Sequence, residues 1–338
     1  MSVMSMDKVL ELKLCAPLYS TFHVQGTGGA VMYNNPTIRN WYYNETVNLR
    51  CTRRFLNGYS SPELTVPKSL WNEIPHLEQR WYGMEFLKGY VNVVIRELLA
   101  QGYYVNFGGV DDYYVKGKSW YKKRHFNHDG LIHGYNQNEK TFRIYAYDES
   151  FIYRSFDTGQ RHFNEGRKAM FDKGIYGYIC GIKPKNEKVM IEPVRIYNGI
   201  KEYLNSSFDI YPMDEEGEVY GIVVLDYLIM YIKMLLNGTV SYEKMDWRIF
   251  RLLWEHESVM KERIRLVSGM FRMHTSLAGN YTDIVKEADT IRILYASYHM
   301  KKRDHLLHTI LEKLNFIRAE EERILTQFTE LLGGVLKI

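Results

Sequence analysis

The sequence predicts an α+β protein in which helices pack on an antiparallel sheet in the first part and an α-helical bundle follows. Segments with strand-like alternation and turn residues are concentrated before about residue 190. Beyond that point, apolar residues recur at alternating three- and four-residue steps, the spacing of amphipathic helices. No internal repeat or low-complexity linker interrupts the chain. We therefore expect two closely packed domains, 1–190 and 191–338.

The first part alternates between strand and helix signals. Apolar and polar residues alternate in the strands, and a polar turn segment, "NQNEK", separates two of them as in a β-hairpin. Helices are expected where apolar residues recur every three or four positions and where a Pro or Gly then ends the helical segment. The expected strands are Lys8–Leu18, Tyr103–Val115, His128–Tyr135, Lys140–Asp148 and Gly174–Ile182, and the expected helices are Gly29–Pro36 and Gly83–Gly102.

The last third carries three sets of apolar residues at helical spacing. Such faces are buried when amphipathic helices pack as an antiparallel bundle, so these side chains are expected in a core. The Gly333-Gly334 pair is expected to end the last helix. The sets are Phe250, Leu253, Met260, Ile264, Val267 and Phe271; Leu307, Ile310, Leu314 and Ile317; and Ile324, Phe328 and Leu331.

Composition argues against several classes of protein. The net charge is only +4, and the basic stretch Lys116–His125 is too short for the basic stripe of a nucleic-acid binder. The apolar run Tyr220–Leu236 is interrupted by Asp226 and Lys233, so it is read as a buried helix and no membrane association is expected. The N-terminus lacks the pattern of a signal peptide.

The three cysteines are far apart and odd in number. This argues against a disulfide framework and favours a reducing compartment, so a cytoplasmic location is expected. Because no CxxC pair is present, a thiolate zinc site is not expected either.

The stretch Arg124–Ser150 holds three histidines within ten residues. In a strand, His128 and His133 would point to opposite faces, so they could not share one metal ion. We expect no metal and no cofactor. One alternative is that these are ordinary structural histidines of a hairpin.

A second interpretation is catalytic. Two adjacent antiparallel strands can bring the start of one beside the end of the next, so a hairpin can set Asp148 against His128. A carboxylate on one ring nitrogen fixes the tautomer and leaves the other nitrogen to act as a general base.

At these residues the chain resembles papain-like cysteine peptidases, and more narrowly the bacteriocin-leader peptidases and the butirosin-type acyltransferases. The resemblance rests on "HDGLIHGYN...IYAYD", on "VDDYY" before it, and on the spacing of Tyr121, His125 and His128. It spans about residues 10–155. It implies a papain-like fold with His128 as general base and Asp148 as its orienting carboxylate.

The resemblance also implies a cysteine nucleophile at a helix N-terminus, with an oxyanion glutamine just upstream. Gln25-Gly26 resembles that glutamine and its glycine, which places the expected cysteine at Ala30 or Val31, with Ala30 preferred because a helix is expected to start near it. Because alanine is no nucleophile, the chain is either a Cys-to-Ala variant, uses Cys15 or Cys51, or has no nucleophile.

Relatives of the butirosin and closthioamide type imply amide formation in nonribosomal natural-product biosynthesis. The acyl chain would come from a phosphopantetheine thioester on an acyl carrier protein, and a small amine, such as a diamine, would accept it. Alternatives are a cysteine peptidase or thioester hydrolase, and a papain-like binding module without catalysis. The expected substrate-binding residues are Asp111, Asp112, Tyr114, Tyr121 and His125, whose carboxylates could hold an amine and whose rings could line an acyl pocket.

Overall fold

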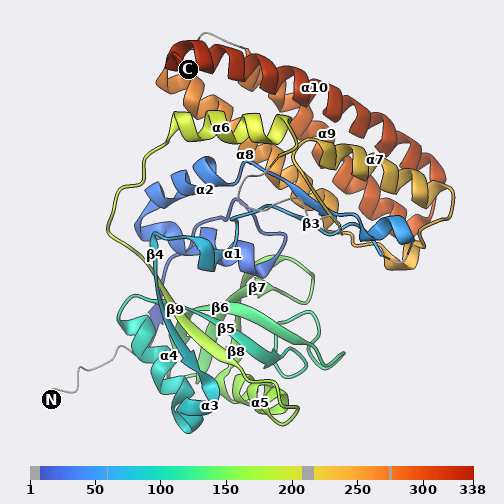
Figure 1. Cartoon of the computed structure of the whole chain (residues 1–338). Helices are drawn as coiled ribbons and strands as arrows, with labels where there is room; N and C mark the ends of the chain where they lie inside the picture. The colour runs from blue at the N-terminus through green and yellow to red at the C-terminus, as the bar shows by residue number, and fades with distance from the viewer. Residues whose placement is uncertain (1–7, 59, 208–216, 274–275) are drawn as a thin grey trace. The chain divides into compact units, whose positions relative to one another are not determined.

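The computed structural model describes residues 8–58, 60–207, 217–273 and 276–338, and the chain folds into two units (Figure 1). Unit 1 comprises Met1–Ile38 and Leu70–Lys188, and unit 2 comprises Arg39–Ser69 and Val189–Ile338. The expectation of helices, an antiparallel sheet and a helical C-terminal region is confirmed. Residues 39–69, which we expected in the first domain, belong to unit 2. Residues 1–7, which bear on the signal-peptide expectation, lie outside the described residues.

Unit 1 is built on an antiparallel sheet with the strand order β4-β9-β5-β6-β7-β8, and β1 also pairs with β6. The predicted hairpin is present, because β6 and β7 pair in the register Ile132 with Ile144. The strand predicted near residue 180 joins the same sheet as β9. The strands are β1 (Val9–Glu11), β4 (Leu77–Gly83), β5 (Tyr104–Asp111), β6 (Asn127–Asn136), β7 (Thr141–Tyr147), β8 (Tyr153–Gly159) and β9 (Tyr178–Pro184).

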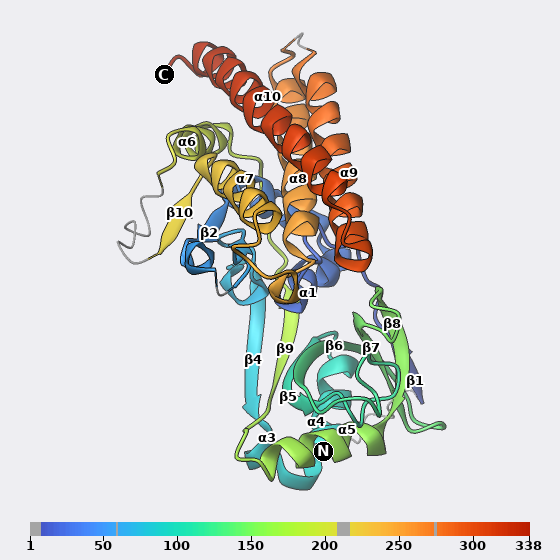
Figure 2. The same ribbon diagram turned by 90° about the vertical axis from the view of Figure 1, so that its right-hand side faces the viewer.

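Two helices, α4 (Val91–Ala100) and α5 (Gln160–Phe171), cover one face of this sheet (Figure 2). The Phe163 ring of α5 packs edge-on against Phe107 of β5, with ring centroids 5.1 Å apart. The helix predicted over 83–102 is broken into α3 (Met84–Leu87), a 3-10 turn and α4. The break lies at Lys88, whose φ of 48° no continuous helix can contain.

The opposite face of the sheet carries α1 (His23–Ala30), followed by two 3-10 turns over Val31–Asn34 and Pro36–Ile38. Successive strand residues point to opposite faces, so Asn106 lies away from Phe107 and its amide donates to the Thr27 hydroxyl of α1. Gly26 lets the helix approach the sheet, since a Cβ there would come within 2.7 Å of the Tyr153 ring.

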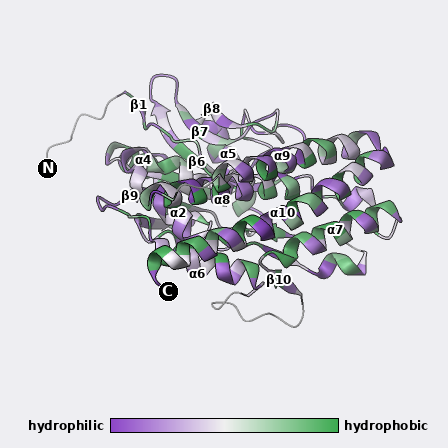
Figure 3. Cartoon of the chain, turned by 90° about the horizontal axis from the view of Figure 1, so that it is seen from above, coloured by the Kyte–Doolittle hydropathy of each residue, from purple (hydrophilic) through white to green (hydrophobic). Residues whose placement is uncertain are grey.

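Unit 2 combines a small antiparallel sheet, in the order β10-β2-β3, with long helices. Most of the predicted apolar residues are buried in helices, and Figure 3 shows hydrophobic and hydrophilic residues alternating along these helices. Two predicted core positions were wrong, because Leu331 is 40% exposed and Phe271 is only partly buried, just past the end of α8. The last helix passes through Gly333-Gly334 and ends at Leu336, so the predicted stop was wrong. The elements are β2 (Arg50–Thr52), β3 (Leu64–Thr65), β10 (Glu218–Tyr220), α2 (Arg39–Glu45), α6 (Pro193–Leu204), α7 (Val223–Leu236), α8 (Ile249–Met270), α9 (Leu277–Lys301) and α10 (Asp304–Leu336).

The apolar run of α7 is buried, as predicted, and within the described residues no helix has the length and apolar character needed to cross a membrane.

A group of buried polar side chains joins three helices of unit 2. The Tyr281 hydroxyl lies 2.6 Å from a Glu257 oxygen and 2.7 Å from a Glu321 oxygen.

The neighbouring His256 indicates the protonation state of Glu257. The Nε2 atom of His256 donates to the Val47 carbonyl, 2.9 Å away, and burial lowers the pKa of His256 to about 4. The neutral ring therefore presents the Nδ1 lone pair to the other Glu257 oxygen, 3.2 Å away. That oxygen must carry a proton, in agreement with burial raising the pKa of Glu257 to about 7.

Replacing Glu257 with glutamine is expected to make unit 2 less sensitive to pH. The pKa of Glu257 is raised from 4.5 to about 7 in the folded protein. Its contribution to stability is therefore full below pH 4.5 and is lost as the pH rises to about 7. In urea unfolding, Glu257→Gln should gain roughly 2 to 4 kcal/mol over the wild type between pH 4.5 and 7.5. His23 and His256 titrate in the opposite direction in both proteins, so they cancel in this difference. Glu321 does not cancel, because the charge of Glu257 helps to raise its pKa and glutamine removes that charge.

The matched control is Glu262→Gln, an exposed position on the same helix whose partner is Arg265. Its difference from the wild type should stay flat across the same pH range. A flat profile for Glu257→Gln as well would mean that the buried carboxyl ionises like an exposed one.

Candidate active site

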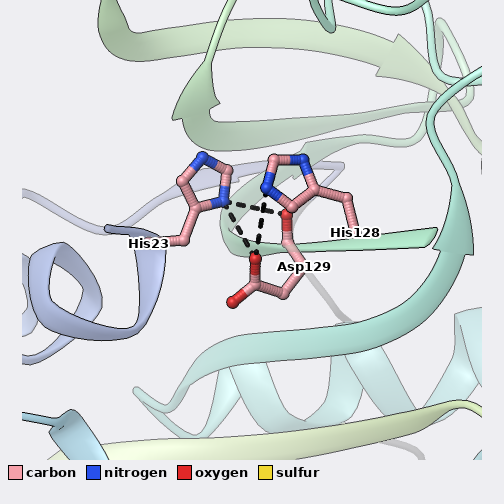
Figure 4. A group of neighbouring side chains, drawn as sticks. All are labelled: His23, His128 and Asp129. Atoms are coloured by element: carbon pink, nitrogen blue, oxygen red, sulfur yellow. Dashed lines mark hydrogen bonds and ion pairs between the residues drawn. The ribbon is translucent and has the colours of Figure 1, made fainter. Parts of the chain in front are cut away.

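Two imidazole rings from distant parts of unit 1 stack on each other. His23 is the first residue of α1, and His128 is the second residue of β6. Their ring centroids are 4.4 Å apart with an interplanar angle of 19° (Figure 4). The segment between β5 and β6 supplies the charged groups around them.

His128 forms a carboxylate–imidazole pair, but with Asp112. Its Nδ1 lies 2.8 Å from Oδ2 of Asp112, whose side chain is buried. A carboxylate can only accept, so Nδ1 carries the proton and Nε2 keeps its lone pair. The buried Lys118 ammonium lies 3.5 Å from the other Asp112 oxygen and fixes the carboxylate. Its Nε2 atom lies 3.7 Å from Oδ1 of Asp129, beyond hydrogen-bond distance, and the side chain is 25% exposed, so Nε2 can still act as a base.

The predicted pairing of His128 with Asp148 was wrong. The Asp148 carboxylate accepts from the backbone N–H groups of Ser150 and Ile152, each at 2.9 Å, and is paired with Arg154. Burial alone would raise the pKa of Asp148, but these donors outweigh it and lower that pKa. Among the described contacts, Asp148 therefore shapes the turn between β7 and β8.

The strand register explains why the prediction came close. Leu131 pairs with Tyr145, and continuing that register would set His128 opposite Asp148. The described β6–β7 pairing stops at Leu131, however, and Lys118 forms a β-bridge to Asp148. The segment between β5 and β6 thus lies against Asp148, where the side chain of His128 was expected.

His23 is buried and holds one tautomer. Its Nε2 accepts from the Tyr147 backbone N–H at 3.1 Å, so its Nδ1 carries the proton and lies 3.2 Å from the Asp129 carboxylate. Burial, reinforced by the charge of Lys118, lowers the pKa of His23 to about 4. Burial would raise the pKa of Asp129, but the hydrogen bond from His23 and the charge of Lys118 bring it to about 2. Asp129 is therefore ionised beside a neutral His23.

Helix α1 starts at His23, seven residues before Ala30, where its start was predicted. It follows Phe22, and Ala30 is its last residue. Ala30 is fully buried, so the proposed nucleophile position at Ala30 was wrong. Gln25 lies inside the helix, two residues after His23, rather than ahead of it. The residue at the helix start, where the resemblance places a cysteine, is His23.

Among the contacts of the described residues, none joins a cysteine thiol to His128. The Cys15 N–H donates to the Ala30 carbonyl, at the end of α1 opposite to His23. Cys51 is buried in β2 of unit 2, and Cys180 is buried in β9. Burial raises the pKa of Cys51 and of Cys180 to about 12, which leaves almost no thiolate at neutral pH.

The predicted substrate-binding acids serve the protein itself. Asp111 is buried, and it accepts from Nδ1 of His125 at 2.7 Å and from the Phe126 N–H at 3.0 Å. Asp112 holds His128. Neither carboxylate is therefore available to an amine in the way the sequence suggested. His125, half exposed, stacks on Tyr113 with ring centroids 4.3 Å apart.

Tyr114 and Tyr121 are brought together by a lysine. The Lys122 ammonium lies 5.2 Å from the centroid of Tyr114 and 5.7 Å from that of Tyr121. These are cation–π distances, and they define an aromatic surface on the segment that also supplies Asp112 and Lys118. His133 has a structural role, with its ring nitrogens 2.9 Å from the Leu12 carbonyl and the Ser155 hydroxyl.

A metal ion fits this site poorly. His23, His128 and Asp129 each offer a ligand atom, and these atoms lie within 4.8 Å of one another. The two rings are nearly parallel, however, so their in-plane lone pairs run side by side instead of converging on one ion. The Lys118 ammonium, 3.4 Å from Nδ1 of His128, adds a positive charge.

No protein-family model matches the chain, and no curated protein is significantly similar to it. The assignment of this site therefore depends on its geometry alone.

The sequence patterns did not identify His23, Lys118 or Asp129 as site residues. The "HD" pair at 128–129 placed Asp129 next to the candidate base, but no spacing signal connects His23 with a residue more than a hundred positions later.

Proposed function

We propose that unit 1 is a papain-like acyltransferase that forms amides by general-base catalysis, without a cysteine acyl-enzyme. The observation that carries this proposal is the His128–Asp112 pair, with its Nδ1 proton held at 2.8 Å and its Nε2 lone pair on a partly exposed ring. No described contact joins Cys15, Cys51 or Cys180 to His128, and a histidine, His23, occupies the start of α1.

The reaction transfers an acyl group from a thioester to an amine. The amine nitrogen attacks the thioester carbonyl carbon, and Nε2 of His128 takes the proton that the nitrogen loses. The C–S bond then breaks, and the imidazolium returns that proton to the leaving thiolate. Asp112 stabilises the imidazolium while it exists, and Lys118 keeps Asp112 in place.

A thioester is a suitable donor because its cleavage drives amide formation without ATP. The donor class we propose is an acyl chain on the phosphopantetheine thiol of a carrier protein, and the acceptor is a small amine. The tyrosine surface around Lys122 is a suitable wall for an aromatic acyl chain.

A second candidate is a papain-like module that only binds an acyl or peptide chain. Its support is His23, whose two ring nitrogens are both engaged by the protein, so the residue at the usual nucleophile position cannot attack a carbonyl. In this reading His128 and Asp112 are a remnant of catalysis.

The full chain, incubated with an acyl-pantetheine thioester with and without a diamine, tests the two candidates. We expect amide by mass spectrometry, no covalent adduct in the intact mass of the protein, and unchanged turnover in Cys15→Ala. An adduct that disappears in Cys15→Ala would replace our proposal with a covalent route. Hydrolysis that the diamine does not affect would indicate a thioesterase, and the absence of any turnover would favour the binding module.

A further inference from the structure

A groove of about 760 Å³ lies in unit 1 between α5 and Asn92 of α4, beside the turn that joins β6 to β7. His128 stands at the start of β6 and this turn follows the end of that strand. At the rise of a β-strand, the length between them is roughly 25 Å. The groove is therefore separate from the candidate active site.

The lining of the groove is basic. Lys140, Arg161, Arg167 and Lys168 contribute four positive charges, against two carboxylates, Glu139 and Glu165. Two of the cations are already paired: Arg161 donates to Glu165 at 2.9 Å, and Lys168 lies 4.0 Å from Asp172, which leaves Lys140 and Arg167 against Glu139. The remaining balance favours an anion.

Arg167 is the residue that most needs a partner. Its Nε atom is buried and has no hydrogen-bond acceptor, and within the described residues no carboxylate pairs with its guanidinium. Burial lowers the pKa of Arg167, and no acidic neighbour counteracts that shift. By contrast, Arg143, on β7 of the same unit, is paired with both Glu11 and Asp157. A partly buried guanidinium without a counter-charge is costly unless a ligand supplies one.

A second unsatisfied atom lies along the same lining. The Nδ1 atom of His162 is buried without a partner, five residues before Arg167 on α5. The side-chain oxygen of Asn92, on α4, is also buried without a donor. The groove thus offers two unpaired nitrogens and one unpaired oxygen, so its occupant needs hydrogen-bond acceptors together with a donor such as a hydroxyl.

We propose that this groove binds a small organic phosphate, with the phosphate group on Arg167 and His162. A phosphate matches the planar Arg fork with two oxygens and brings the negative charge that the lining lacks. Lys140 supplies a second cation, and a hydroxyl of the organic part donates to Asn92. The proposal stands whether or not unit 1 catalyses acyl transfer.

Calorimetric titration of the full chain with glycerol 3-phosphate, inorganic phosphate and sulfate tests this site. We expect both phosphates to bind, with Arg167→Gln weakening the affinity about 10- to 100-fold, the loss of a charged hydrogen bond. The matched control is Arg143→Gln, since Arg143 lies outside the lining of the groove and is already paired with Glu11 and Asp157. It should change the affinity less than threefold. Tighter binding of the ester than of inorganic phosphate would locate recognition in the organic part as well.

Protection of the wild-type protein gives a measurement that needs no variant. Phenylglyoxal should modify Arg167 more slowly in the presence of either phosphate, as read by peptide mass spectrometry, while Arg143 stays unprotected. The proposal fails if neither phosphate binds at 10 mM, if sulfate binds equally well, or if both arginines matter alike.

Discussion

Asp112→Asn is expected to slow amide formation by about three to four orders of magnitude, whereas Asp148→Asn should leave the rate per folded molecule nearly unchanged. Asp112 accepts the Nδ1 proton of His128 at 2.8 Å. An asparagine amide can instead donate to Nδ1, which moves the ring proton to Nε2 and removes the lone pair that acts as base. Asp148 is bound to the turn after β7 and to Arg154.

The measurement is the initial rate of amide formation from the thioester and the diamine, normalised to folded protein by circular dichroism. His128→Ala should lose as much activity as Asp112→Asn, and the double variant should lose no more than either, because the pair acts as one unit. Equal losses in Asp112→Asn and Asp148→Asn would mean that the geometry of the pair does not control the chemistry.

Arg263→Met is expected to destabilise unit 2 by roughly 3 to 5 kcal/mol. Arg263 of α8 is fully buried and donates to the carbonyls of Tyr43 at 2.7 Å and Thr46 at 3.0 Å. These carbonyls lie at the C-terminal end of α2, where helix carbonyls lack intrahelical partners and carry partial negative charge. Methionine fills similar space but removes the guanidinium donor that these two buried carbonyls share.

Urea unfolding followed by circular dichroism measures this loss. Arg265→Met is the matched control, two residues further along α8, because Arg265 is exposed and pairs only with Glu262. Its expected change is within about 0.5 kcal/mol. Arg263→Lys keeps the charge but not the fork, so an intermediate loss is expected. Similar losses at positions 263 and 265 would refute the capping role.

Local spacing was sufficient to predict the hairpin of β6 and β7 and the long helices of unit 2. In each, the apolar period extends over many residues, so the pattern outweighs any single side chain. The same reasoning located His128, because the residue stands at the entry to a clear strand.

The start of α1 could not be predicted from local signals. Its sequence, "HVQGTGGA", contains three glycines, and Phe22 offers no capping side chain. The helix forms despite its glycines because it packs closely against the rest of unit 1, and two of the glycines, Gly26 and Gly29, are needed for that close approach. A Cβ at Gly29 would come within 2.8 Å of Pro17, and one at Gly26 would meet Tyr153. The placement of His23 beside His128 is thus a tertiary effect.

Which carboxylate pairs with His128, Asp112 or Asp148, also depends on tertiary structure. Both acids stand at suitable separations from His128, and only the β-bridge of Lys118 to Asp148 decides which carboxylate reaches the ring. No spacing along the chain reports where that segment crosses the sheet.

The assignment of residues 39–69 to unit 2 sets an order of events during synthesis. Strand β2 pairs with β10, and the end of α2 is capped by Arg263, so the early segment completes its contacts only after the whole 70–188 insert has been made. At the usual rate of translation, this segment waits roughly 10 to 40 seconds on the ribosome before β10 and Arg263 have been synthesised. A gene fragment that starts at residue 189 would lack β2 and α2, so unit 2 is best expressed with both of its pieces, the first joined to residue 189 by a short linker.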